Sequence, residues 1–185
     1  MTAVVRGSIA GGVALSFCLM SGPSPSARAD DGKSVALAKQ LAAALTAAKL
    51  DSVAAKDPAA PDTFVAALFF PGQFLVISAK YAAPPLMSER IGKKEYRDVY
   101  LDLNGASVPN TKVFIEDPGA DGLKADHVDN QPFDTYEADG KRLAFDADWK
   151  KQKLSKEDYL KAFADADQRY AEMLQALLAE LKKPT

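Results

Sequence analysis

Few residues of this chain have the type and setting that catalysis needs, and the first is His127, the only histidine. It follows Asp126, and Asp129 stands two residues further on. A histidine can act as a general base when a carboxylate orients its ring and a hydroxyl lies within reach, and Ser78 or Ser88 could supply that hydroxyl. Neither serine lies in the Gly-x-Ser-x-Gly setting of an exposed nucleophile. His127 is the candidate catalytic residue of a hydrolase, but a surface histidine is the interpretation that we prefer.

Acidic residues are concentrated between positions 116 and 148, and clustered oxygen ligands can bind calcium. Asp126 and Asp129 are the candidate metal ligands of this stretch. The stretch lacks the alternate carboxylates around a glycine that a calcium loop requires. Zinc fits less well still, because one histidine leaves only carboxylates to complete four ligands. We therefore predict no metal site and interpret the stretch as a solvated acidic loop and hairpin.

A serine–lysine dyad is a further candidate, because Ser78 and Lys80 stand two residues apart and would project from one face of a strand. Such a dyad needs a desolvated lysine whose lowered pKa lets it act as a base. Lys80 stands near the predicted end of its strand, where a charge is normally solvated. We prefer to interpret Lys80 as a solvent-facing charge.

Two basic clusters could hold an anionic ligand, and the second adjoins Trp149, the only tryptophan. The first cluster contains Arg90, Lys93, Lys94 and Arg97, and the second contains Lys150, Lys151, Lys153 and Lys156. The candidate ligand-binding residues are Tyr81, Arg97, Trp149 and Lys150, with the indole ring as a stacking wall. Solvated lysines around a buried tryptophan are the simpler alternative. Because phosphate-binding glycine loops and dinucleotide fingerprints are missing, we predict no cofactor.

The elements that must position these residues begin with an alanine-rich helix over 33–50, in which Leu37, Leu41, Ala44 and Ala48 are spaced by four, three and four. A proline-containing linker over 57–62 follows it. Strands are predicted at 63–70, apolar on both faces, and at 73–81. Pro71-Gly72 favours a type II turn, so we expect a longer or bulged connection between these strands.

The remaining elements follow from the same signals. Asp139-Gly140, flanked by strands, is the strongest hairpin signal in the chain. The predicted elements are a short helix at 86–94, strands at 98–103 and 112–116, a polar loop at 117–131, and strands at 133–138 and 141–145.

A long helix ends the chain, with Ser155 as its N-cap and Asp158 in a variant of the capping box. Its apolar residues follow a three-four spacing that only Asp167 interrupts. A helix of this length either packs along the amino-terminal helix, which we prefer, or pairs with a second chain as a homodimer through residues 155–183.

The first 29 residues have the layout of a secretory signal peptide, with Arg6, an apolar run from Ile9 to Met20, and small residues around a cleavage site after Ala29. Cys18 would be lost with this segment. The expected mature chain, residues 30–185, is then one cysteine-free domain without a membrane anchor, located in the periplasm or outside the cell. Its 21 basic and 25 acidic residues argue against nucleic-acid binding.

These observations predict an α+β domain with a mostly antiparallel sheet of five or six strands packed by the first and last helices. A second cover, or partial closure into a barrel, would account for the strand that is apolar on both faces. The leading functional hypothesis is an exported binding or interaction domain for a small molecule or protein. The alternatives are an enzyme, either a flavin-barrel protein or a hydrolase using His127, and a structural dimerising subunit.

Overall fold

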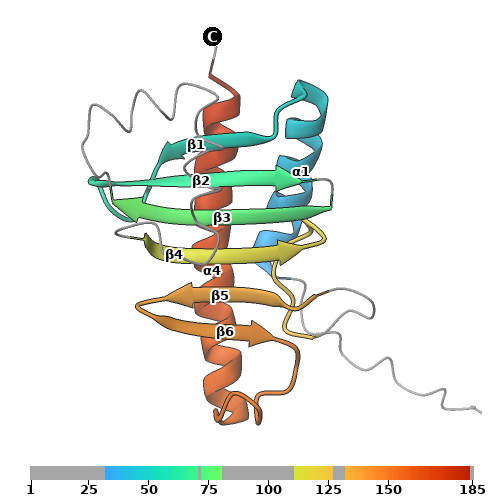
Figure 1. The fold of residues 1–185 in the computed structure, drawn as a ribbon, viewed down its shortest axis with the longest axis vertical. Helices are drawn as coiled ribbons and strands as arrows, with labels where there is room; N and C mark the ends of the chain where they lie inside the picture. Colours follow the sequence, from blue (N-terminus) through green and yellow to red (C-terminus); the bar gives the residue numbers. More distant parts are fainter. Residues whose placement is uncertain (1–31, 71, 81–110, 127–131, 184–185) are drawn as a thin grey trace, which may run out of the picture.

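The structure is a computed structural model that describes residues 32–70, 72–80, 111–126 and 132–183. It has six antiparallel strands that follow one another in sequence order across one sheet, with two helices on a single face of that sheet (Figure 1). The elements are α1 (Lys33–Ala48), β1 (Ser52–Lys56), β2 (Thr63–Phe70), β3 (Gln73–Lys80), β4 (Thr111–Pro118), β5 (Asp134–Ala138), β6 (Lys141–Phe145) and α4 (Lys156–Leu181). The predicted α+β class and its antiparallel sheet are confirmed. The sheet is open, with β1 and β6 as its edges, so the suggested closure into a barrel is not present.

The helix α1 forms where it was predicted, but its buried face is not the predicted stripe. Leu41 is buried as expected, whereas Leu37 is only partly buried and Ala48 is exposed. The buried residues are Ser34, Val35, Ala38, Leu41 and Leu45. The stripe predicted from leucines and alanines is therefore rotated relative to the true one, because alanine contributes little to deciding which face turns inward.

The first strand, β1, was not predicted. Its sequence, Ser-Val-Ala-Ala-Lys, has little intrinsic preference for a strand. It forms because its residues pair with β2 from Ser52 opposite Leu68 to Lys56 opposite Phe64. Tertiary pairing therefore decides the conformation of this segment.

The connection between β2 and β3 corrects the prediction of a longer or bulged loop. Phe70 pairs directly with Gln73, so only two residues join the strands. Gly72 has φ +80°, which supplies the left-handed conformation that such a tight turn needs. The irregularity lies instead on the other side of β3, where the pairing with β4 shifts between Ser78 and Ala79.

The hairpin of β5 and β6 confirms the Asp139-Gly140 signal. Asp139 has φ +51° and Gly140 has φ +71°, and positive φ at both central residues is typical of a type I′ turn. Ala138 pairs with Lys141 across this turn.

The helix-covered face of the sheet contains the main core, and α4 crosses all six strands behind it (Figure 1). The helix α1 lies beside α4, behind the β1 end of the sheet. Met173, Leu174 and Leu177 of α4 are fully buried in this core. The preferred packing of the last helix along the first is therefore confirmed.

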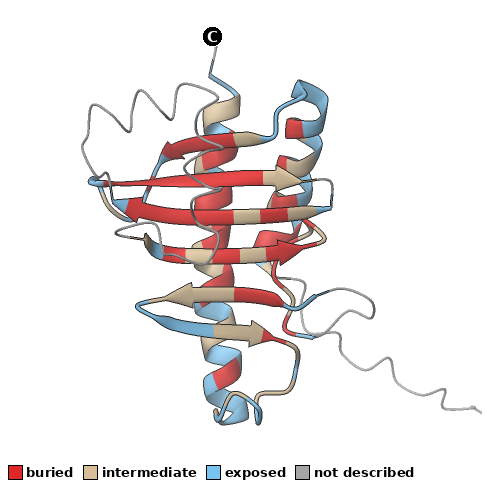
Figure 2. Cartoon of the chain, in the orientation of Figure 1, coloured by how far each residue is buried: buried red, intermediate tan, exposed pale blue. Residues whose placement is uncertain are grey.

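The second face of the sheet, on which neither helix lies, is also apolar. Its buried residues are Ala54, Phe64, Ala66, Leu68, Ile77 and Ala79, and Phe70, Leu75 and Phe114 pack against them. Figure 2 shows β2 buried along most of its length, as expected for a strand that is apolar on both faces, whereas in β6 only Phe145 is buried. The predicted helix at 86–94 and strand at 98–103 lie outside the described residues.

The loop after β4 approaches the first turn of α1 at Gly122. A Cβ atom there would overlap the Cα of Val35 and would lie 2.5 Å from the backbone nitrogen of the same residue. Gly122 also has φ +89°. Both the space and the backbone conformation therefore require glycine at this position.

We expect Gly122→Ala to lower the free energy of unfolding by about 3 kcal/mol, because it adds overpacking against backbone to left-handed strain. Gly72→Ala is the matched control, since Gly72 has a similar φ of +80° but a Cβ atom there would meet nothing within 4 Å. That control should lose about 1 kcal/mol from strain alone. Urea denaturation measures both values, and equal losses would show that the approach to α1 is not tight.

Candidate functional site

The most polar part of the interior lies where α1 begins, and its first component is Asp167 of α4. Its Oδ2 accepts the N–H of Lys33 at 2.6 Å, and its Oδ1 accepts the N–H of Ser34 at 3.0 Å. These are orphan donors of the first turn of α1, so a side chain from another helix caps α1. A Cβ atom at Gly32, the N-cap residue, would overlap Oδ1 of Asp167, so glycine leaves room for the carboxylate.

The loop that follows β4 is held by a second buried carboxylate, Asp117. Asp117 accepts the N–H groups of Gly122 at 2.9 Å and Asp121 at 3.1 Å, and the hydroxyl of Tyr170 donates to it at 2.9 Å. The N–H of Leu123 in turn donates to Oγ of Ser34 at 2.9 Å. The loop is thereby tied to both helices as well as to its own strand.

A third buried carboxylate, Asp134 at the start of β5, completes this region. Its Oδ2 accepts the N–H of Lys124 at 2.7 Å. Burial and the negative charge of Asp117 raise the pKa of Asp134 to about 8. Burial also raises the pKa of Asp117, although the hydrogen bonds from Gly122, Tyr170 and Asp121 oppose this effect. Two such carboxyls next to each other favour the state that retains a proton at neutral pH.

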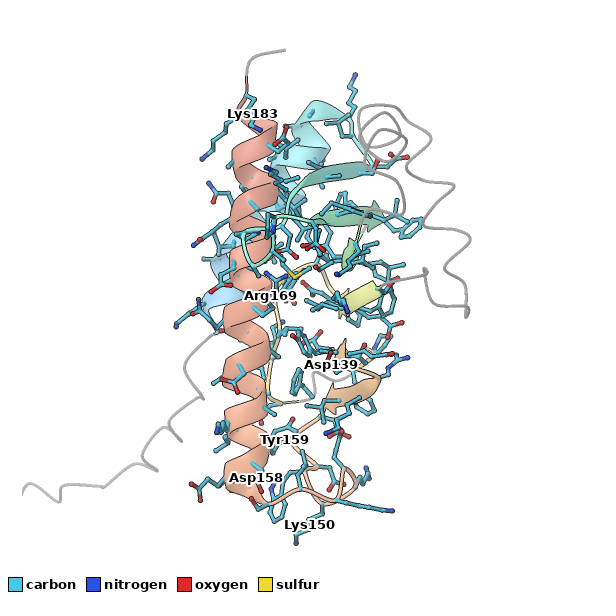
Figure 3. The ribbon with its side chains drawn as sticks, turned by 90° about the vertical axis from the view of Figure 1, so that its left-hand side faces the viewer. Asp139, Lys150, Asp158, Tyr159, Arg169 and Lys183 are labelled. Carbon is cyan, nitrogen blue, oxygen red and sulfur yellow. The ribbon has the colours of Figure 1, made fainter. Side chains whose placement is uncertain are left out.

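A separate cluster lies on the helix side of the sheet, where Arg169 extends from α4 toward the strands (Figure 3). Its Nη2 donates to Oδ2 of Asp57 at 2.5 Å, and Oγ of Ser78 donates to the same oxygen. Burial acts to raise the pKa of Asp57, but these hydrogen bonds and the guanidinium charge outweigh it and lower that pKa. Asp57 also accepts the N–H of Ala59 at 2.8 Å, so the cluster fixes the turn after β1 to α4 and β3.

The structure does not bring Ser78 and Lys80 together as a catalytic dyad. Ser78 is buried, and its hydroxyl donates to Asp57, which is paired with Arg169, so Ser78 makes no bond to Lys80. The Nζ of Lys80 lies 2.9 Å from Asp62, in a pair that is largely exposed. The preferred interpretation of Lys80 as a solvated surface charge agrees with this geometry.

The predicted ligand-binding residues Trp149 and Lys150 do lie together. The Nζ of Lys150 is 5.3 Å from the centroid of the Trp149 ring, which packs partly buried against the core. Lys151 pairs with Asp148 at 3.0 Å. Between positions 146 and 158 four lysines face four acidic residues, so the segment is not a net positive surface. Tyr81 and Arg97 lie outside the described residues.

The predicted catalytic residue His127 and the predicted metal ligand Asp129 also lie outside the described residues. Asp126 is described and exposed. Over the described ranges no group of three potential metal-ligating side chains is found. These candidates therefore stay predictions.

The buried carboxylates were not predicted from the sequence, although local patterns mark two of them, Asp117 and Asp167. Asp117 follows Val113 and Ile115 with the two-residue period of a strand, which turns it toward the core with them. Asp167 is the single interruption in the apolar pattern of the last helix. In each case a charged residue at a core position marks a buried polar contact.

Comparison with known proteins gives no relative: no family model, curated protein or solved structure matches the chain. Of the described helices, none has both the length and the apolar character needed to cross a membrane.

The raised pKa of Asp134 predicts a pH-dependent stability. The unfolded state releases this proton near the ordinary value of 3.8, whereas the folded state keeps it up to about 8. The free energy of unfolding should therefore fall as the pH rises from about 4 to 8, by up to about 1.4 kcal/mol per pH unit for one proton, and level off above that range. Asp134→Asn should reduce this slope and be more stable than the wild type at pH 8.

Urea denaturation between pH 5 and pH 9 measures this effect, with Asp165→Asn on the exposed face of α4 as the control of equal charge change. The control should keep the slope of the wild type. A slope that is the same in all three proteins would show that Asp134 is ionised in the folded state throughout this range.

The cap provided by Asp167 can be tested in the same way. We expect Asp167→Ala to lower the free energy of unfolding by about 2 kcal/mol, because two backbone donors of α1 lose their acceptor. Gln168→Ala is the control, since it removes only bonds between side chains, the exposed one from Lys33 Nζ and the one that Gln168 donates to Glu172, and should cost about 0.5 kcal/mol. Equal losses by circular dichroism melting would contradict the capping role.

Proposed function

We propose that this protein is an exported, non-enzymatic binding or interaction domain. One observation carries the proposal: all four buried aspartates of the described residues accept backbone N–H groups. Asp57 holds the turn after β1, Asp117 and Asp134 hold the loop after β4, and Asp167 holds the start of α1. Carboxylates committed in this way stabilise the fold and are not free to act on a substrate.

The surface of the described residues is consistent with this proposal. Its exposed large apolar side chains are Leu50 before β1, Phe133 before β5 and Leu160 in α4. Trp149 adds an aromatic ring next to Lys150. The export part of the proposal depends on the signal-peptide layout of the first 29 residues, with the working domain starting at Asp30.

Native mass spectrometry of the protein purified from its own host tests both parts. We expect a chain that begins at Asp30, and a bound species of defined stoichiometry that dissociates on denaturation. A His127→Ala variant prepared in parallel should retain the same bound species, because a binding domain does not need that side chain.

Three results would contradict the proposal. A chain that still carries Met1 would exclude export by this route. A bound flavin, which also colours the protein yellow, would support the enzyme alternative. So would a hydrolytic activity that is lost in His127→Ala.

A further inference from the structure

The two edge strands of the sheet, β6 and β1, differ in how their outward backbone groups are hydrogen-bonded. At β6 the side-chain amide of Gln152 takes the place of a neighbouring strand: its Oε1 accepts the N–H of Ala144 at 3.3 Å, and its Nε2 donates to the carbonyl of Ala144. The segment that carries Gln152 thereby occupies this edge. Among the described residues β1 pairs with β2 alone, and β2 lies on the side of β1 that faces the rest of the sheet. Edges left with unpaired backbone are templates for another strand.

The hydrogen bonds at the ends of β1 show which of its groups point outward. Phe69 donates to the carbonyl of Asp51, and Asp57 donates to the carbonyl of Thr63. Because bonding alternates along antiparallel strands, Val53 and Ala55 also face β2. The N–H and C=O groups of Ser52, Ala54 and Lys56 therefore point away from the sheet. Within the described part of the chain no residue pairs with them.

Both helices continue past β1, so their carboxyl-terminal ends overhang this edge (Figure 1). Figure 3 shows Lys183 at this end of α4. Asp158 lies at the other end of the helix, near Lys150. A strand added to β1 would thus have helix ends on one side of it. Leu50, which is 42% exposed, and the partly buried Leu181 provide apolar contacts there.

The overhanging end is mainly basic. Its lysines are Lys49, Lys182 and Lys183, and Lys56 is the last residue of β1; all four are exposed. Its acids are Asp51 and Glu180, and Glu180 is bonded to Lys183. An extended segment that adds to β1 would therefore be favoured by alternating apolar and acidic side chains.

We infer that the outer edge of β1 binds an extended, acidic segment of a partner polypeptide as an additional strand. Backbone groups of Ser52, Ala54 and Lys56 supply the hydrogen bonds, and the helix ends supply the side-chain contacts. This inference rests on the proposed function and names its partner class. A second copy of the chain is a poorer occupant, because pairing β1 with itself would bring two sets of lysines together.

Fluorescence polarisation with labelled heptapeptides tests this inference. The probes are an acetylated peptide of alternating valine and glutamate, and one of alternating valine and lysine. We expect the glutamate peptide to bind at least about tenfold more tightly than the lysine peptide. In the complex, the amides of Ser52, Ala54 and Lys56 should become protected from hydrogen exchange.

Proline variants locate the site. Ala54→Pro removes an outward N–H without removing a bond to β2, and should weaken binding by at least about tenfold. Arg142→Pro is the control at the opposite edge: it removes an outward N–H of β6 together with the ion pair between Arg142 and Glu116, neither of which involves β1. It should leave binding unchanged. Thermal melting of both variants establishes that they are folded, and the exchange measurement on the wild type does not depend on either variant.

Several results would overturn the inference. Binding that survives in a folded Ala54→Pro variant would place the peptide elsewhere, and failure of the glutamate peptide to bind would mean that shortness and Lys56 protect this edge. Protection of the three amides in the free protein would mean that the chain covers its own edge, or, if it depends on concentration, that a second copy does. If the species retained from the host stays bound to Ala54→Pro, the β1 site is wrong while the proposed binding function stands.

Discussion

The carboxylate of Asp167 against the first turn of α1 is the contact on which the arrangement of the helices depends. An alanine-rich helix of this length has little stability of its own in water, and its first N–H groups need acceptors. Gly32 supplies no side-chain cap, so the acceptors come from α4, more than 130 residues later in the chain. This interaction fixes the position of α1 along α4. With α1 in this position, the loop after β4 contacts it at two points: Leu123 donates to Ser34, and Gly122 packs against the backbone of Val35.

A buried carboxylate also holds the turn after β1 and the loop after β4. A meander of strands buries its own backbone groups, but the turn after β1 and the loop after β4 do not belong to the ladder and must find other acceptors. Asp57, Asp117 and Asp134 provide them. The accompanying desolvation is compensated by Arg169 at Asp57 and is avoided at Asp134 by retention of its proton. These buried aspartates are therefore explained by the backbone N–H groups that need an acceptor.

Local patterns predicted most of this fold, because helix caps, a type I′ turn and apolar runs are signals within a few residues. Ser155 accepts the N–H of Asp158 as predicted, and Asp139-Gly140 forms its hairpin. The contacts of Asp57 with Arg169 and of Asp167 with α1 were missed because the partners are distant in sequence, whereas β1 was missed because its residues have little intrinsic preference for a strand. Asp57 and Arg169 are 112 residues apart, and no local pattern connects them. Among the predicted site residues that lie in the described ranges, the structure brings Trp149 and Lys150 together.

The two ends of the sheet show why a fold can be predicted more easily than its function. α4 is longer than the sheet is wide, so it extends past both edge strands (Figure 1). A few residues decide what lies beside each edge strand under the end of the helix. At β6 a single glutamine side chain reproduces the hydrogen bonds of a strand. At β1 the described residues offer backbone groups, two leucines and lysines in that space. In the described residues the backbone at one edge is thus bonded to a side chain, while the outward backbone groups at the other edge are not paired with a strand.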